Sequence, residues 1–271
     1  MNDYLTIRLL KTNEEMGLIQ GLERAIWGTD PVPTHQTFTA VKNGGLMLGA
    51  FLDQEIVGFS YSFPGYVNGK LRLCSHMLGV HPDYQQMGIG NALKNEQLKF
   101  AKELGYDLIT WTFDPLESRN AYLNVAKLYG ICDTYLENCY GEMKDGLNRG
   151  LPSDRFQIDW WISSQRVEEK WMPKITKYDC PFIVSESDKG NPVLLYENER
   201  IPTDCEGIEV PIPKNLQAIK KDEPELALDW RMKTRAIFQT LFAAGYTLVN
   251  VNRSSATVQY YQLVKKESIP I

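Results

Sequence analysis

The stretch from Gln85 to Asn91 holds the residues best suited to chemistry, because two closely spaced glycines, Gly88 and Gly90, precede a helical pattern. A strand-like apolar run comes before them, and apolar residues recur at helical spacing from Ile89 onward. The first amides of a helix lack intrahelical acceptors, and the helix dipole attracts anions. Glycines let an anion approach the main chain. The sequence therefore predicts a loop that binds a diphosphate through backbone amides.

Two other phosphate-binding loops fit this stretch less well. A Rossmann loop needs a third glycine where Leu93 stands and an acidic residue at the end of the next strand. A Walker loop needs Gly-Lys-Ser/Thr, which does not occur in the sequence. A pair of glycines one residue apart is itself expected roughly 1.5 times by chance in such a chain. The prediction therefore depends on the strand, loop and helix around the pair.

At Val80-x-Pro82 and Gln85-x-x-Gly88-x-Gly90 the sequence resembles the GNAT superfamily of acyl-CoA-dependent N-acyltransferases. The order of strands and helices expected over roughly residues 4–162 is also similar to that family. The resemblance implies an α/β fold with a mixed central sheet flanked by helices, in which two neighbouring parallel strands splay apart.

The resemblance also implies how the chain binds its co-substrate, acetyl-CoA or another acyl-CoA, without a metal. The splayed strands would be residues 71–80 and 106–113, and the pantetheine arm would lie between them. Main-chain groups of Leu78 and Val80 would contact the pantetheine. The amides that would contact the pyrophosphate are those of Gln85, Gln86, Met87, Gly88, Ile89, Gly90 and Asn91.

The implied reaction is direct transfer of an acyl group to an amine, which must lose a proton before it attacks the thioester. The family often places an acidic residue on the motif strand as the base. Here two-residue steps back from Leu78, which keep to one strand face, reach His76 and then Cys74. With an ordinary pKa of about 6.5, His76 could act as the base, and a structural histidine explains the residue equally well. A buried core thiol explains Cys74 better than a nucleophile does.

The helix expected after the second splayed strand departs from the family's pattern of Asn, Ala, Leu-Tyr and Gly-Phe. Asn120 and Asn124 are candidate contacts of the cofactor. Alignment on Ala121 puts Val125 at the position of the family's tyrosine acid. Alignment on Tyr129 restores a tyrosine with a changed spacing, so Tyr129 is a candidate acid. A partly buried aromatic residue at a helix end explains Tyr129 somewhat better.

Charged residues elsewhere support weaker hypotheses. Asp114 could orient a substrate ammonium and Arg119 could bind a phosphate or an acyl carboxylate, but a helix start and a solvated arginine explain them better. Arg231 and Arg235 lie one helical turn apart and could hold a substrate carboxylate. Such a pair more often lies on a solvated face.

Composition argues against several other classes of function. The 271 residues carry 29 Lys and Arg against 34 Asp and Glu, a net charge of −5, which disfavours a nucleic-acid partner. No apolar run approaches the roughly 20 residues that cross a bilayer, so no membrane partner is expected. Five cysteines without a C-x-x-C pair predict reduced thiols rather than disulfides or a zinc site. The N-terminal residues carry no export signal, so we expect a cytoplasmic location.

Hydrophobic periodicity predicts the elements that position the loop. Strands are expected at 5–10, 46–52, 55–63, 71–80, 106–113, 134–143 and 155–162. Helices are expected at 14–27, capped by Asn13, and at 88–104 and 117–127. Beyond residue 163 we expect short strands at 182–184 and 193–196, a helix opened by Asp222 and Pro224, and strands at 246–251 and 257–264. The helix–strand–strand order of 117–162 recurs at 224–264, and coincidence explains this slightly better than an internal repeat.

These predictions combine into two domains, an acyl-CoA-binding catalytic domain at residues 1–163 and a smaller α+β extension at 164–271 that packs on it. The predicted activity is transfer of an acetyl or related acyl group, succinyl included, to a primary amine of a small molecule such as an amino acid. A protein lysine or N-terminus is the alternative acceptor. The alternative function is a catalytically silent CoA-binding sensor or interaction module. The sequence leaves a homodimer open.

Overall fold

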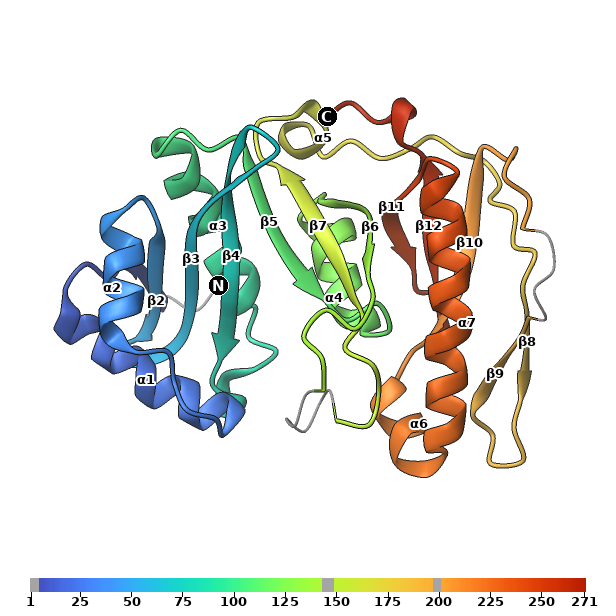
Figure 1. Ribbon diagram of the computed structural model, residues 1–271, viewed down its shortest axis with the longest axis horizontal. Coiled ribbons are helices and arrows are strands. Elements are labelled where there is room, and N and C mark those ends of the chain that lie inside the picture. The colour runs from blue at the N-terminus through green and yellow to red at the C-terminus, as the bar shows by residue number, and fades with distance from the viewer. Residues whose placement is uncertain (1–4, 143–148, 197–200) are drawn as a thin grey trace. The chain divides into compact units, whose positions relative to one another are not determined.

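The computed structural model describes residues 5–142, 149–196 and 201–271, which form two compact units (Figure 1). Unit 1 comprises residues up to 111 together with 161–163, and unit 2 comprises 112–160 together with 164–271. The chain passes between the units inside strands β5 (Leu108–Phe113) and β7 (Arg155–Trp161). The compact units therefore differ in their bounds from the predicted domains, whose functional boundary stays a prediction.

Unit 1 is built on a mixed sheet with the strand order β1-β2-β3-β4-β5. Its elements are β1 (Leu5–Leu9), α1 (Asn13–Trp27), α2 (Thr34–Lys42), β2 (Leu46–Leu52), β3 (Glu55–Val67), β4 (Lys70–Val80), the 3-10 turn η1 (Pro82–Tyr84), α3 (Ile89–Glu103) and the first part of β5. Neighbouring strands are antiparallel except β4 and β5, which are parallel. The mixed α/β fold predicted from the sequence is confirmed.

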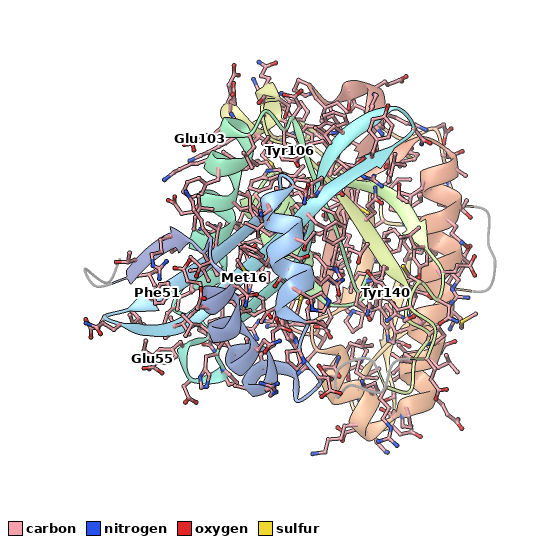
Figure 2. All side chains as sticks on the ribbon, turned by 60° about the vertical axis from the view of Figure 1, so that its left-hand side comes forward. Met16, Phe51, Glu55, Glu103, Tyr106 and Tyr140 are labelled. Carbon is pink, nitrogen blue, oxygen red and sulfur yellow. The ribbon has the colours of Figure 1, made fainter. Side chains whose placement is uncertain are left out.

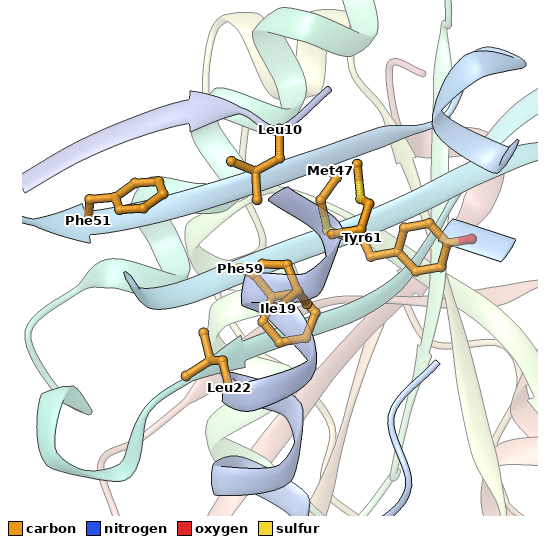
Figure 3. Packing of buried hydrophobic residues seen from close by; sticks show 8 residues of the cluster. Leu10, Ile19, Leu22, Met47, Phe51, Phe59 and Tyr61 are labelled. Atoms are coloured by element: carbon orange, nitrogen blue, oxygen red, sulfur yellow. The ribbon is translucent and has the colours of Figure 1, made fainter. Parts of the chain in front are cut away.

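Helices cover both faces of this sheet, with α1 and α2 on one face and α3 on the other (Figure 1). Figure 3 shows the core on the first face, where α1 packs on β2 and β3 through Leu10, Met16, Ile19, Leu22, Met47, Phe51, Phe59 and Tyr61. The core on the α3 face contains Leu48, Ala50, Val57, Ile89 and Leu93. Because strand side chains alternate, consecutive residues of β2 contribute to opposite cores.

Helix α1 begins one residue earlier than predicted, with Thr12 rather than Asn13 as its N-cap. The Thr12 hydroxyl accepts from the Glu15 amide at 3.2 Å, and the Glu15 carboxylate accepts from the Thr12 amide at 3.1 Å. This reciprocal capping box satisfies two amides that Asn13 alone would leave open. Helix α2 was not predicted, because Thr37 is its one fully buried residue and its apolar periodicity is weak.

A turn between α3 and β5 ties two parts of unit 1 together. Figure 2 labels Glu103 at the end of α3 and Tyr106 just after it. The Tyr106 hydroxyl donates to the Gly44 carbonyl at 2.9 Å, before β2. This bond holds the start of β5 against the strand hairpin of β2 and β3.

Unit 2 contains a sheet with the strand order β7-β6-β11-β12-β10 and a separate hairpin of β8 and β9. Its elements after β5 are α4 (Ser118–Ala121), the π-helical segment η2 (Tyr122–Lys127), β6 (Ile131–Leu136), β7, α5 (Gln165–Glu168), β8 (Ile183–Glu186), β9 (Pro192–Leu195), β10 (Gly207–Pro213), α6 (Leu216–Asp222), α7 (Pro224–Ala243), β11 (Tyr246–Asn252), β12 (Val258–Lys265) and η3 (Lys266–Ser268). The strand predicted at 134–143 forms earlier, as β6, and Met143 lies outside the described residues.

The two halves of unit 2 follow the same path. In the first half a helical segment is followed by the antiparallel pair of β6 and β7, and in the second half α7 is followed by the antiparallel pair of β11 and β12. β10 was not predicted from the sequence, and Pro211 and Pro213 argue against a strand there. β10 ends the strand order, where an edge position tolerates proline. The recurrence noted in the sequence thus extends to strand topology.

Within the part of the chain that the structure describes, every helix is too short or too polar to cross a membrane.

Candidate functional site

The parallel strands β4 and β5 pair at two positions only, Leu73 with Ile109 and Cys74 with Thr110. β4 continues to Val80 and stays paired with β3 along this length. One edge of β4 beyond Cys74 is therefore not paired with β5. This is the pair of parting strands that the sequence predicts around the pantetheine arm.

The main chain of Leu78 and Val80 points to this open edge. The His81 amide donates to the Val57 carbonyl of β3 at 2.9 Å, which fixes the alternation of main-chain groups along β4. Gly79 lies two residues before His81 and faces β3 as well. Leu78 and Val80 lie between these positions, so their N–H and C=O groups face away from β3. Both predicted pantetheine contacts thus present unpaired main chain at the open edge.

The loop before α3 presents its main chain to open space. Gln86 and Gly88 have left-handed φ values of 71° and 79°, and the residues from Gln85 to Gly88 are exposed. A Cβ atom at Gly88 would meet no atom within 4 Å, and one at Gly90 would meet only a methyl group of Leu78 at 3.8 Å. The loop is therefore unobstructed and lies next to the open edge of β4.

The first amides of α3 are available to an external acceptor. The Ala92 amide donates to the Gly88 carbonyl at 3.0 Å, so the amides of Ile89, Gly90 and Asn91 precede the intrahelical ladder. Gly88 is the N-cap and has no side chain that could accept from them. These amides and the positive end of the helix dipole lie where the sequence predicts a diphosphate. Their role toward a ligand stays a prediction.

A β-bulge in β4 determines where His76 points. Between Tyr61 and Ser62, adjacent in β3, the register on β4 passes from Met77 to Ser75, which leaves His76 as the extra residue. The bulge interrupts the regular alternation of the strand.

The bulge places His76 on the face that α1 and α2 cover. Its ring centre lies 6.1 Å from that of Tyr61 and 5.5 Å from that of Phe63, whereas Leu78 packs against the core on the α3 face. The prediction that His76 and Leu78 share a strand face is therefore wrong, because the extra residue shifts the alternation.

His76 lines a cavity of about 630 Å³ inside unit 1. The other lining residues come from α2, the segment before it and β3, namely Val32, His35, Gln36, Thr39, Ala40, Tyr61 and Phe63. The volume is in the range of small-molecule sites. His76 keeps an exposed edge, yet partial burial in the cavity wall lowers its pKa. Its imidazole is therefore neutral at neutral pH and can accept a proton.

Glu23 of α1 supports one wall of this cavity, a role that was not predicted from the sequence. Its side chain is buried, and its carboxylate accepts from the Val32 amide at 2.8 Å. Burial raises the pKa of Glu23. Burial also raises the pKa of Tyr61, with added contributions from the nearby Cys74 and Glu23. A lone glutamate in an amphipathic helix carries no sequence signal for this role.

Asn120, Asn124 and Tyr129 lie in unit 2, on and just after the helical segment that follows β5. Asn120 in α4 is exposed, whereas Asn124 in η2 is buried. The π-helical winding of η2 changes which residues share a face, so the two asparagines have different surroundings. Tyr129 has a left-handed φ of 60°, and its carbonyl accepts from Arg166 Nε at 3.0 Å. Their roles toward a cofactor stay predictions.

Asp114 and the arginines of α7 form ion pairs inside unit 2. Arg231 is fully buried and pairs with Asp114, and Arg155 lies 3.6 Å from the same carboxylate. Arg235 pairs with Asp154 at 2.7 Å. The solvated face expected for the arginine pair is therefore wrong for Arg231, and the carboxylates that bind both arginines belong to this chain.

No three His, Cys, Asp or Glu side chains among the described residues are grouped so that they could hold a metal ion.

Residues 13–126 match the model of the acetyltransferase (GNAT) family. This segment contains the parting strands, the loop before α3 and the His76 cavity, and it is similar to that family along its length. The family match supports an acyl-CoA-dependent N-acetyltransferase of the GNAT type.

Solved structures of acetyltransferases are similar to the chain at low sequence identity. The ribosomal-protein-S18-alanine N-acetyltransferase from Escherichia coli is 16% identical, with 65% of this chain and 99% of that chain covered and a TM-score of 0.46. The putative acetyltransferase yncA from Salmonella typhimurium with acetyl-CoA is 14% identical over 59% and 95% of the two chains, with a TM-score of 0.47. A GNAT family acetyltransferase from Elizabethkingia anophelis with acetyl-CoA bound is 17% identical over 59% and 99%, with a TM-score of 0.41.

At these sequence identities and TM-scores, the likeness gives no information on the substrate or the catalytic residues of this chain. Among curated proteins, no sequence matches the chain.

Proposed function

We propose that this protein transfers an acetyl or related acyl group from acyl-CoA to the primary amine of a small molecule such as an amino acid. One observation carries the proposal: the unobstructed amides at the start of α3 adjoin the open edge of β4 at Leu78. A diphosphate and an extended amide-containing arm are the two chemical parts that such a surface fits.

The residues present fit a CoA molecule. The amides of Ile89, Gly90 and Asn91 would hold the pyrophosphate, and the main chain of Leu78 and Val80 would pair with the pantetheine amides. When bound, acyl-CoA supplies an activated thioester. The chain's own contribution is to orient this group and to manage the protons of the acceptor amine.

The acceptor amine would enter the cavity that His76 lines. An amine attacks only when neutral, and the neutral imidazole of His76 can take its proton, directly or through water. Among the described residues, the lining side chains include two histidines and two other aromatic rings but no Asp, Glu, Lys or Arg. A wall without fixed charge favours the neutral amine and an apolar body beside it.

A turnover assay with a panel of acceptors tests this proposal. Free thiol is measured from acetyl-CoA and succinyl-CoA with amino acids, aromatic and aliphatic amines, and a short peptide with a free N-terminus. Turnover with a small amine supports the proposal, and turnover with the peptide alone would replace the acceptor class. CoA binding by calorimetry without turnover on any acceptor would contradict transfer and support the silent CoA-binding module.

A further inference from the structure

Five buried polar side chains form a cluster between α3 and the strands β3 and β4, which we call the Lys94 cluster: Lys94, Gln97, Ser60, Ser62 and Ser75. Lys94 Nζ donates to Ser75 Oγ at 2.8 Å and to Gln97 Oε1 at 3.1 Å. Gln97 Nε2 in turn lies 3.0 to 3.1 Å from the hydroxyls of Ser60, Ser62 and Ser75. Every side chain of the cluster is at most 5% exposed.

The ammonium of Lys94 has no negative partner in the cluster. No carboxylate of the described residues lies within ion-pair distance of it. The titratable group that interacts with it electrostatically is Cys74 of β4, and burial raises the pKa of that thiol, which keeps it neutral. A buried ammonium without a counter-charge is costly, and its burial lowers the pKa of Lys94 to about 7. Such a site stabilises an anion that reaches it.

The cluster lies where β4 and β5 part. Ser75 directly follows Cys74, the last residue of β4 that pairs with β5, and Trp111 directly follows Thr110, the last paired residue of β5. Lys94 Nζ lies 2.8 Å from Ser75 Oγ and 3.6 Å from the centre of the Trp111 ring. The ammonium thus bridges the two strands at the closed end of the gap.

The hydroxyl of Ser75 is oriented by its neighbours. Its oxygen accepts from both Lys94 and Gln97, so the hydroxyl hydrogen is left to donate elsewhere. An adjacent ammonium makes this hydroxyl a stronger donor.

We propose that the Ser75 hydroxyl, with Lys94 behind it as proton source, protonates the thiolate that leaves when the acyl group is transferred. This inference rests on the proposed function and names the group that handles the departing sulfur. It assigns that task to α3 and β4 of unit 1.

The step balances without a further reagent. The amine nitrogen forms a bond to the thioester carbon, the carbon–sulfur bond breaks, and its electron pair stays on sulfur. Ser75 gives its proton to the sulfur and takes one from Lys94 Nζ, which leaves a free thiol and a neutral lysine amine. The proton that the acceptor amine lost goes to His76 or to solvent, and solvent returns one to Lys94 before the next turnover.

Titration of bound CoA tests the inference without turnover. The ultraviolet absorbance of the thiolate is followed against pH for CoA bound to the wild type, Lys94→Met, Ser75→Ala and the control Lys99→Met, whose lysine is exposed on the same helix. We expect the thiol pKa of bound CoA to be lowered in the wild type and the control, and to rise toward that of free CoA in Lys94→Met. An unchanged thiol pKa in Lys94→Met would overturn the inference.

Leaving-group dependence gives a second readout. With acetyl-CoA we expect kcat to fall roughly a hundredfold in Lys94→Met and in Ser75→Ala, with KM little changed, as for loss of a general acid. With an acetyl thioester of an acidic aryl thiol, whose thiolate leaves unprotonated, the loss should largely disappear. An equal loss with both thioesters would mark a merely structural role and overturn the inference.

The two proposals fail in different ways. If the wild type binds CoA but transfers nothing, the proposed function fails, and the thiol titration still decides whether Lys94 acts on the sulfur. If Lys94→Met does not fold, as judged by thermal unfolding, Ser75→Ala leaves the lysine in place and decides the same question.

Discussion

The two units differ in what their buried polar groups bind. In unit 2 the fully buried Arg231 pairs with Asp114, and the fully buried Arg166 donates to the carbonyls of Tyr129, Trp171 and Val249 at 2.7 to 3.0 Å. In unit 1 the buried Lys94 has hydroxyls, an amide and an aromatic ring around it, and the amides at the start of α3 have no acceptor in the helix.

This contrast separates groups used for structure from groups kept for a ligand. Carboxylates and carbonyls of this chain bind the cations of unit 2, although Nε and Nη1 of Arg231 have no hydrogen-bond partner among the described residues. Removal of one partner would leave a buried charge uncompensated. In the proposed function, unit 1 leaves a cation and several amides for an anion that arrives with the substrate. A buried charge is therefore a functional candidate when its partners are neutral, and burial alone does not make it one.

The largest effect on stability should come from breaking a pair in unit 2. Asp114→Asn leaves Arg231 buried without its charge partner, which should lower the free energy of unfolding by about 3–5 kcal/mol. Urea unfolding followed by fluorescence measures this loss. Glu96→Gln, which removes the exposed ion pair with Lys99, is the control and should change little. Equal losses in the two variants would break the contrast between the units.

In unit 1 the corresponding change should affect ligand binding far more than stability. Gly88→Asp places a carboxylate against the predicted pyrophosphate position, so CoA affinity should fall at least about a hundredfold, equivalent to roughly 3 kcal/mol. Gly69→Asp is the matched control, because Gly69 also has a left-handed φ, 77°, and open space around it, but lies in the β3–β4 turn. Calorimetry that finds unchanged affinity in folded Gly88→Asp would refute the diphosphate loop. Gly90→Asp should act in the same direction.

Replacement of His76 should reduce turnover more than CoA affinity. As a base, His76 must be neutral, so kcat/KM should rise with pH as the imidazole loses its proton. Partial burial lowers the pKa of His76, so the midpoint of this rise should lie below the ordinary histidine pKa of about 6.5. His76→Ala should lower kcat by roughly ten- to a hundredfold and remove this acidic limb. His35→Ala, which changes a histidine that lines the same cavity from α2, is the control for altered packing. An acidic limb that persists in His76→Ala would exclude the histidine as base.

The smallest effect should be that of Lys94→Met on stability at neutral pH, within about 1 kcal/mol, because an apolar side chain of similar length removes a buried charge. The pH dependence gives a sharper test. Between pH 7 and the ordinary lysine value of 10.5, the unfolded chain binds a proton at residue 94 that the folded chain has lost. Wild-type stability should therefore rise with pH relative to Lys94→Met across this window, by up to about 1.4 kcal/mol per unit. Parallel stability profiles would show that Lys94 keeps its proton when folded.

The local parts of the site could be predicted from the sequence. The hairpin of β2 and β3, the helix α3 and the glycine loop before it each depend on neighbouring residues, so periodicity and turn residues predict them. The family match then covers the same segment.

The features that depend on distant residues could not be predicted. The bulge at His76 is a register shift between β3 and β4, and sequence alternation within β4 alone does not reveal it. Lys94 follows the apolar Leu93 on α3, and a helical lysine is ordinarily expected to be solvated. The sheet nevertheless buries it. The pair of Asp114 and Arg231 joins residues 117 positions apart, a separation that local patterns do not encode.

The bulge in β4 also has a consequence for proton traffic. Ser75 bonds to Lys94 on the α3 side of the sheet, whereas His76, the next residue, lines the cavity on the α2 side. If both act as proposed, one strand partitions the reaction: the proton leaving the nucleophile and the proton reaching the sulfur travel on opposite sides of the sheet. Neither residue then needs to pass a proton to the other. Substitutions on one side of the sheet can change the proton transfer of one residue without changing that of the other.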